Sequence, residues 1–272
     1  MKLAISGKGG TGKTTLAALL ARALAEAGRP VLAVDADPAA NLGAALGLPR
    51  AEWPEPISSL RELIRRRTGS AEGYGSFFKL NPEVSDLPEK YSRLVHGVRL
   101  LTLGGVAKGG GGCICPESAL LKALVTHILL QPGEVVILDM EAGIEHLGRG
   151  TAQAVSLLAI VVEPGQQSIE TARTIARLAG ELRLPRLGVI INKLPPGLDP
   201  APLLAGLEGL PLLGTFPLDP EIARADLEGR SPWTGSATQR QALEKLLAAI
   251  AAPVPVAGGK DAAPAKRGRA KP

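Results

Sequence analysis

The chain begins with KLAIS at residues 2–6, followed at once by GKGGTGKTT at residues 7–15. The second stretch contains the pattern G-x-x-x-x-G-K-[ST], in which glycines let backbone N–H groups converge on an anion without hindrance from side chains. The helix that follows adds the positive end of its dipole. We therefore predict a phosphate-binding loop. Its nucleotide-contacting residues are expected to be Gly7, Gly9, Gly10, Thr11, Gly12, Lys13, Thr14 and Thr15.

Two side chains of this loop have predicted roles in phosphate chemistry. Lys13 is placed to reach the β- and γ-phosphates, and the hydroxyl of Thr14 is placed to bind Mg²⁺. The surrounding sequence fits, because residues 2–6 form an apolar strand pattern and the leucines after Thr15 recur on one helical face as far as Gly28. The alternative, a glycine-rich turn with an accidental lysine, leaves this context unexplained.

The rest of the chain alternates apolar strands with helical patterns. This alternation predicts an α/β fold with a doubly wound, mostly parallel sheet of about seven to eight strands flanked by helices. Strands are expected at residues 2–6, 31–34, 98–103, 135–138, 157–162, 187–191 and 212–216. Helices are expected at residues 13–27, 57–67, 117–130, 168–182, 221–228 and 239–251. Ligands of such sheets bind beyond the carboxyl ends of the strands.

The length of 272 residues fits one large domain over residues 1–251, followed by a disordered basic tail over residues 252–272. No apolar run approaches the roughly 20 residues of a membrane helix. The phosphate loop follows the start so closely that we expect no leader and a cytoplasmic protein with no membrane partner. The net charge is +5, but aromatic residues are not interleaved with the basic ones, so we do not expect nucleic acid as a partner.

Acidic residues end two of the predicted strands. Asp35 and Asp37 follow residues 31–34, and Asp139 follows residues 135–138. Each aspartate could cap a helix or form a turn. Aspartates that end strands beside a phosphate loop are also well placed to bind Mg²⁺, directly or through a water molecule. Asp35 and Asp139 are therefore candidate Mg²⁺ ligands.

The stretch KGGTGKTT resembles the deviant Walker A loop of a large group of ATPases, which includes the nitrogenase iron protein and the ATPases of division-site placement and plasmid partition. The resemblance implies that Lys8 crosses a dimer interface to the phosphates bound by the partner subunit, so that ATP becomes part of the dimer contact. It also implies that Asp37 in switch I activates the attacking water, that Asp139 in switch II contacts Mg²⁺ through water, and that the backbone of Gly143 senses the γ-phosphate. The catalytic residues would then be Lys8, Lys13, Asp37 and Asp139.

The same resemblance places the adenine among residues that end the last two strands. These residues are Asn192, Lys193, Pro217 and Asp219. Asn192 could hydrogen-bond the edge of the base, or it could simply cap its strand. The preference for ATP over GTP follows from the resemblance and not from the spacing of these residues.

The two cysteines of the chain, Cys113 and Cys115, lie one residue apart after a run of glycines. A disulfide across this spacing would be strained, and a reducing cytosol disfavours it. Pro116 and Glu117 fit the first turn of a helix, so Cys115 is the expected N-cap, where the positive helix end favours the metal-binding thiolate. One pair supplies two ligands where a closed site needs about four, and a twofold dimer supplies four. The alternative is a pair of inert small residues at a helix start.

Three further stretches are similar to the nickel-insertion accessory ATPases of carbon monoxide dehydrogenase. They are CICPESALLKAL at residues 113–124, VILDMEAGIEHLGRG at residues 136–150 and VVEPG at residues 161–165. The similarity implies a homodimer that binds ATP and one shared metal ion, Ni²⁺ with Zn²⁺ as its competitor, through Cys113 and Cys115 of both subunits. ATP hydrolysis would be coupled to delivering nickel to the cluster of carbon monoxide dehydrogenase, the client enzyme. Glu145 and His146 are further candidate ligands, although we expect them to shape the switch.

Two other classes of function remain open on sequence alone. An iron–sulfur or electron-transfer ATPase like the nitrogenase iron protein also has four thiolates across a dimer, but its cysteines are widely separated, and its colour on anaerobic iron loading would reveal it. A partition or positioning ATPase that cycles on DNA or a membrane needs a basic surface or a C-terminal amphipathic helix and has no need of cysteines. Pelleting with DNA or liposomes, with and without ATP, would identify that class.

Overall fold

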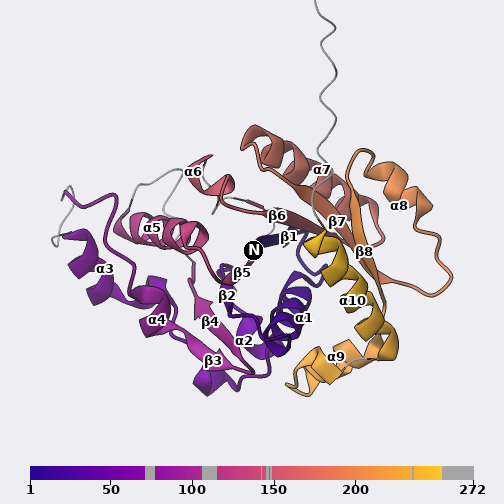
Figure 1. The fold of residues 1–272 in the computed structure, drawn as a ribbon, viewed down its shortest axis with the longest axis horizontal. Helices are drawn as coiled ribbons and strands as arrows, with labels where there is room; N and C mark the ends of the chain where they lie inside the picture. Colours follow the sequence, from indigo (N-terminus) through magenta and orange to yellow (C-terminus); the bar gives the residue numbers. More distant parts are fainter. Residues whose placement is uncertain are drawn as a thin grey trace, which may run out of the picture.

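The strand Lys2–Gly7, which leads into the predicted phosphate loop, lies inside the sheet with other strands on both sides (Figure 1). The computed structural model describes residues 1–70, 77–105, 115–141, 143–144, 147, 149–234 and 236–252. Within them, eight strands form one sheet in the order β3-β4-β2-β5-β1-β6-β7-β8. The strands are β1 (Lys2–Gly7), β2 (Val31–Asp35), β3 (Arg93–Val95), β4 (Val98–Thr102), β5 (Val135–Asp139), β6 (Leu157–Val162), β7 (Leu187–Leu194) and β8 (Leu212–Pro217). The predicted α/β fold is confirmed.

All neighbouring strands run parallel except β3 and β4. The antiparallel pair is joined by His96 and Gly97, whose φ angles of 46° and 79° suit a tight hairpin turn. Strand β3 was not predicted from the sequence, because this strand has only three residues and two of them are exposed. It forms one edge of the sheet, far in strand order from β1.

Helices cover both faces of the sheet, as Figure 1 shows. They are α1 (Lys13–Glu26), α2 (Leu42–Ala45), α3 (Arg61–Thr68), α4 (Leu87–Tyr91), α5 (Pro116–Leu130), α6 (Arg149–Ala152), α7 (Gln166–Glu181), α8 (Ala201–Gly206), α9 (Pro220–Leu227) and α10 (Ala237–Ala251). The parallel strands are joined by crossovers, which is what places helices on the two faces.

Two apolar cores lie on opposite faces, and alternate residues of each strand supply them. Ala4 of β1 belongs to the core under α3, α5 and α7. Leu3 and Ile5 belong to the core under α1 and α10. Since β1 is buried along its whole length, its end is held firmly, and so is the start of the phosphate loop.

Two predicted elements differ from the structure by more than two residues, and the short helices α2, α4, α6 and α8 were not predicted. The helix expected at residues 57–67 is divided into a 3₁₀ turn at Ile57–Ser59 and the helix α3. The N–H of Ser58 donates to the carbonyl of Leu103 at 3.0 Å, which ties this turn to the chain just after β4. Strand β7 runs three residues longer than expected, to Leu194, with an irregular register after Ile191 and a positive φ of 53° at Lys193.

The tail predicted from residue 252 lies almost wholly outside the described residues, which end at Ala252, just after α10. Cys113, Glu145 and His146 also lie outside them. Among the described helices, none combines the length and the apolar character needed to cross a membrane.

Candidate nucleotide-binding site

The phosphate loop closes on itself between β1 and α1. The hydroxyl of Thr11 donates to the carbonyl oxygen of Lys8 at 2.9 Å, and the ammonium of Lys13 donates to the same oxygen at 3.3 Å. Gly12 is the N-cap of α1, and no side chain of the described residues caps this helix end. The first N–H groups of α1 therefore lack side-chain acceptors, which is the arrangement that binds phosphate at a helix N-terminus.

Two glycines of the loop are required by close packing. A Cβ on Gly7 would lie 2.2 Å from the carbonyl oxygen of Val161, its neighbour across β1 and β6. A Cβ on Gly12 would lie 2.4 Å from the side-chain nitrogen of Asn192, and its φ of 88° is in the left-handed region. Both positions leave no room for a side chain, so the loop backbone packs directly on β6 and β7.

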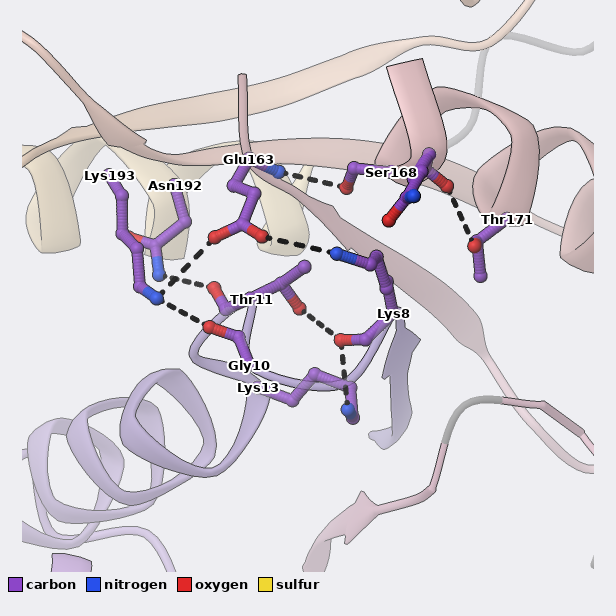
Figure 2. A network of polar contacts seen from close by, with 10 residues as sticks. Lys8, Gly10, Thr11, Lys13, Glu163, Ser168, Thr171, Asn192 and Lys193 are labelled. Atoms are coloured by element: carbon purple, nitrogen blue, oxygen red, sulfur yellow. Dashed lines mark hydrogen bonds and ion pairs between the residues drawn. The ribbon is translucent and has the colours of Figure 1, made fainter. Parts of the chain in front are cut away.

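Asn192 and Lys193, expected near the adenine, brace the loop (Figure 2). The amide nitrogen of Asn192 donates to the carbonyl of Thr11 at 2.8 Å, and the ammonium of Lys193 donates to the carbonyl of Gly10. The amide N–H of Asn192 and the ammonium of Lys193 are thus already bonded to the loop. The side-chain carbonyl oxygen of Asn192 remains available to a base edge. The geometry gives both residues a role in holding the loop that the sequence did not reveal.

Pro217 and Asp219 lie beside this region, at the end of β8. The N–H of Leu218 donates to the carbonyl of Leu194 at 2.9 Å, which joins the ends of β7 and β8. The carboxylate of Asp219 caps α9 by accepting the N–H of Glu221 at 2.9 Å. A capping role therefore accounts for Asp219 whether or not a base lies against it.

Asp139 is a buried carboxylate beside the loop. It ends β5 and is only 1% exposed. Within the described residues, neither of its oxygens has a hydrogen-bonding partner. Burial raises the pKa of Asp139 to about 7, although the nearby Thr14 hydroxyl and Lys13 ammonium act in the opposite direction. A buried carboxylate without partners is costly, so this group is suited to a cation that is held with the nucleotide.

Asp35 pairs in register with Asp139 across β2 and β5, but its environment is different. Its carboxylate accepts the N–H groups of Asp37, Asn41 and Leu42 at 3.2, 2.9 and 2.8 Å. Burial raises the pKa of Asp35 to about 6, and these three amides act against the rise. The bonds hold residues 36–41 as a loop, which favours a structural role for Asp35 over the Mg²⁺ ligand considered from the sequence.

Asp37 lies on that loop and is half-buried. Its carboxylate accepts the N–H of Ala39 at 2.8 Å, which is the local bond of an aspartate turn. Its own N–H donates to Asp35, so the loop position of Asp37 depends on that buried carboxylate. The structure thus places Asp37 just after β2 and Asp139 at the end of the neighbouring strand β5, so both lie at the carboxyl ends of these strands.

Ser6 and Glu163 belong to the site but were given no role from the sequence. The Ser6 hydroxyl donates to the carbonyl of Gly143 at 2.7 Å and accepts the N–H of Gly143 at 3.2 Å, so the expected γ-phosphate sensor is tied to β1. The carboxylate of Glu163 lies between Lys8, at 3.8 Å, and Lys193, at 3.4 Å (Figure 2). Neither role follows from the sequence, because Ser6 contacts Gly143 and Glu163 contacts Lys8 only through the fold, each more than a hundred residues away in the chain.

Cys115 is the N-cap of α5, as expected. Its sulfur accepts the N–H of Ser118 at 3.4 Å. Its partner in the motif, Cys113, lies outside the described residues. In the part of the chain that the structure describes, no three histidine, cysteine, aspartate or glutamate residues gather as a metal site would require. Because the chain has two cysteines, a site with four thiolates would need two subunits.

Comparison with known proteins places the chain in a family. A family model described as CbiA, the CobQ/CobB/MinD/ParA nucleotide binding domain, matches residues 2–233. The chain belongs to this family. As a CobQ/CobB/MinD/ParA protein with an intact phosphate loop, it is a P-loop ATPase, and the resemblance stated from the KGGTGKTT loop is confirmed.

Within the CobQ/CobB/MinD/ParA family, the chain is 46% identical over 252 residues to the carbon monoxide dehydrogenase accessory protein CooC of Rhodospirillum rubrum. This match covers 92% of the chain and 96% of that protein, and it confirms the second resemblance. An uncharacterised ATP-binding protein of Methanocaldococcus jannaschii is 43% identical over 235 residues, covering 85% and 90% of the two chains.

Solved structures of the family share the fold. The cell division protein MinD of Aquifex aeolicus superposes with a TM-score of 0.66 at 21% identity, covering 93% of this chain and 98% of that one. The septum site-determining protein MinD of Pyrococcus horikoshii, complexed with Mg-ADP, gives a TM-score of 0.63 at 24% identity, covering 90% and 93%. At these identities the likeness supports the fold alone.

Proposed function

We propose that the protein is an ATP-hydrolysing metallochaperone that dimerises with ATP and metal and assists nickel insertion into carbon monoxide dehydrogenase. The high identity to a carbon monoxide dehydrogenase accessory protein over nearly the whole of both chains supports this client. One observation carries the nucleotide chemistry: the buried, unpartnered carboxylate of Asp139 lies beside a phosphate loop whose helix end is uncapped. We further propose a cytoplasmic protein whose ATPase domain spans residues 1–251, with residues 252–272 as a basic tail.

The residues at the loop fit a magnesium nucleotide. Thr14 would bind the ion through its hydroxyl, and Asp139 would contact it through a water molecule. Lys13, whose ammonium now donates to the Lys8 carbonyl, would turn to the β- and γ-phosphates. When bound, the ion neutralises charge on the phosphates. The oxygens of Asp139 support this assignment, because a hydrated cation would supply the hydrogen-bonding partners that the described residues do not.

Water attack on the γ-phosphate depends on positioning rather than on a covalent intermediate. Asp37 would orient the attacking water from the loop held by Asp35. The N–H of Gly143 would exchange its bond with Ser6 for one with the γ-phosphate. Lys8 would reach the phosphates bound by the partner subunit, so that each site is complete only in the dimer. The adenine would lie by Asn192, Lys193, Pro217 and Asp219, at the joined ends of β7 and β8.

The metal cargo would be held by Cys113 and Cys115 from two subunits. Four thiolates suit a tetrahedral zinc ion, and nickel would compete with a planar arrangement. The N-cap position of Cys115 supports this proposal, because the N–H of Ser118 and the helix end stabilise a thiolate there. A twofold axis near this helix end would bring the two pairs together.

Metal stoichiometry tests the proposed shared site. Metal-free protein titrated with Zn²⁺ or Ni²⁺ is expected to bind about one ion per two chains and to sediment as a dimer. The double variant Cys113→Ser/Cys115→Ser should lose both effects and keep ATP binding, whereas Ser118→Ala should keep both, since the bond at Cys115 comes from the Ser118 backbone. One ion per chain, or unchanged binding by the double variant, would overturn the shared site.

A further inference from the structure

Three charged side chains meet at the rim of the phosphate loop (Figure 2). Glu163 lies between Lys8, whose ammonium is 3.8 Å from one carboxylate oxygen, and Lys193, whose ammonium is 3.4 Å from the other. Lys193 also donates to the carbonyl of Gly10. The proposed nucleotide chemistry assigns a role to Lys8 and none to Glu163. The carboxylate nevertheless binds the one lysine that is expected to leave its own subunit.

Glu163 is held rigidly against the loop. It directly follows β6, and its N–H donates to the hydroxyl of Ser168 at 3.0 Å. Ser168 is 2% exposed, so this anchor is inside the protein. Strand β6 is in turn locked to the loop, because Gly7 packs on Val161 with no space between them. The backbone of Glu163 is therefore anchored beside the phosphate loop, and Lys193 holds its carboxylate there from the other side.

A single ammonium cannot pair with Glu163 and also extend to a phosphate in another subunit. We propose that Glu163 is a latch that holds Lys8 back in the nucleotide-free subunit and releases it when ATP joins two subunits. The inference rests on the proposed role of Lys8 across the dimer. Release of Lys8 has a small free-energy cost, because Lys193 stays paired with the carboxylate of Glu163.

The exposure of the pair sets the size of the effect. The side chains of Lys8 and Glu163 are 36% and 25% exposed, so their ion pair is screened by solvent. Such pairs shift an equilibrium by a factor of about two to five. A symmetric dimer releases two latches, and the two factors multiply. Removing the latch is therefore expected to raise the association constant of the ATP-bound dimer about 4- to 25-fold.

The test is sedimentation of the full chain across a range of protein concentrations, with Mg²⁺ and a non-hydrolysable ATP analogue. Glu163→Gln should dimerise at a concentration about 4- to 25-fold lower than the unchanged protein. Glu170→Gln, which removes an exposed carboxylate from α7, is the matched control and should show no shift. The difference in dimerisation concentration between Glu163→Gln and the unchanged protein should become smaller at high salt, because salt weakens the ion pair between Lys8 and Glu163.

Combining Glu163→Gln with Lys8→Ala distinguishes the latch from any other role of Glu163. In the Lys8→Ala protein, Glu163→Gln should leave dimerisation unchanged, since no latch remains to be released. A gain that persists without Lys8, or a Glu163→Gln protein that dimerises no better than the unchanged chain, would overturn the latch. If Lys8→Ala alone dimerises normally, the proposed role of Lys8 across the interface fails, and the latch that rests on it fails for that separate reason.

Discussion

The hydroxyl of Ser6 donates to the carbonyl oxygen of Gly143 at 2.7 Å, and the N–H of Gly143 donates back to Ser6 at 3.2 Å. Ser6 lies in β1, immediately before the phosphate loop, and Gly143 follows the end of β5. The pair of bonds joins the start of the loop to the segment expected to sense the γ-phosphate. The two halves of the proposed site therefore cannot move independently while these bonds persist.

Ser6→Ala should uncouple these segments. Removing the hydroxyl leaves the buried carbonyl oxygen of Gly143 without its bond to Ser6, so the free energy of unfolding is expected to fall by about 1–3 kcal/mol. ATP should still bind, because the phosphate loop itself is unchanged, while the rate of hydrolysis should fall. Chemical denaturation, nucleotide titration and phosphate release measure the three effects. Ser92→Ala is a control at a half-buried serine outside the site. An unchanged hydrolysis rate would show that the bonds serve stability alone.

Lys13→Ala should abolish nucleotide binding by the isolated subunit. The phosphates would lose the one side-chain cation that the subunit's own loop is proposed to aim at them. Fluorescent-nucleotide titration checks this, with Lys122→Ala on the exposed side of α5 as the control. Retention of nucleotide affinity within a few-fold would mean that the loop holds its ligand without Lys13.

Asp37→Asn should bind ATP and accumulate as a dimer. The phosphate contacts survive in this variant, but the side chain can no longer activate water as a carboxylate does. Gel filtration after incubation with Mg-ATP, together with phosphate release, tests the expectation. Asp199→Asn, at the N-cap region of α8, is a matched loop aspartate. Turnover near that of the unchanged protein would reduce Asp37 to a turn residue.

The pH dependence of stability should report on Asp139. Its pKa in the folded protein is about 7, against an ordinary value of 3.8. Between these values the folded state binds more protons than the unfolded state, so the free energy of unfolding falls as pH rises from about 4 to about 7. In nucleotide-free protein with EDTA, Asp139→Asn should therefore melt higher than the unchanged protein at pH 8. The two should converge near pH 5, where Asp139 is protonated.

Asp226→Asn changes an exposed carboxylate on α9 and serves as the control. Its melting temperature should differ from that of the unchanged protein by the same small amount at pH 5 and pH 8. Equal melting temperatures of Asp139→Asn and the unchanged protein at pH 8 would contradict the buried, unpartnered state of this carboxylate. Asp35 is kept in every protein of the set, because its own raised pKa of about 6 adds a similar slope and its charge is one of the causes that raise the pKa of Asp139.

The central strands and the loop were predictable because their signals are local. The apolar run of β6 is continuous, and its predicted bounds at 157–162 coincide with the observed ones. The hairpin strand β3 escaped prediction, because its exposed residues carry no apolar pattern. The break at Leu60 between the 3₁₀ turn and α3 was not predicted either, because it depends on the hydrogen bond from Ser58 to Leu103, just after β4.

In the candidate site, too, the residues with local sequence signals were predicted and those that act through distant contacts were not. The loop glycines and Lys13 follow from the motif, whereas Ser6 and Glu163 act through contacts with residues 137 and 155 positions away, respectively. Glu163 is paired with Lys8 only because β6 lies beside β1 in the sheet. Strand β7 follows β6 in the sheet and brings Asn192 against Gly12, so the bracing of the loop by Asn192 could be read only from the fold.

The most direct test of the account is nickel-dependent activation of carbon monoxide dehydrogenase that has been prepared without nickel. With limiting Ni²⁺, the protein and Mg-ATP, enzyme activity should appear faster than with Ni²⁺ alone. A non-hydrolysable analogue, Asp37→Asn or the Cys113→Ser/Cys115→Ser double variant should each remove the acceleration. Activation at the same rate without the protein, or with the double variant in its place, would contradict the proposal that this ATPase delivers the metal.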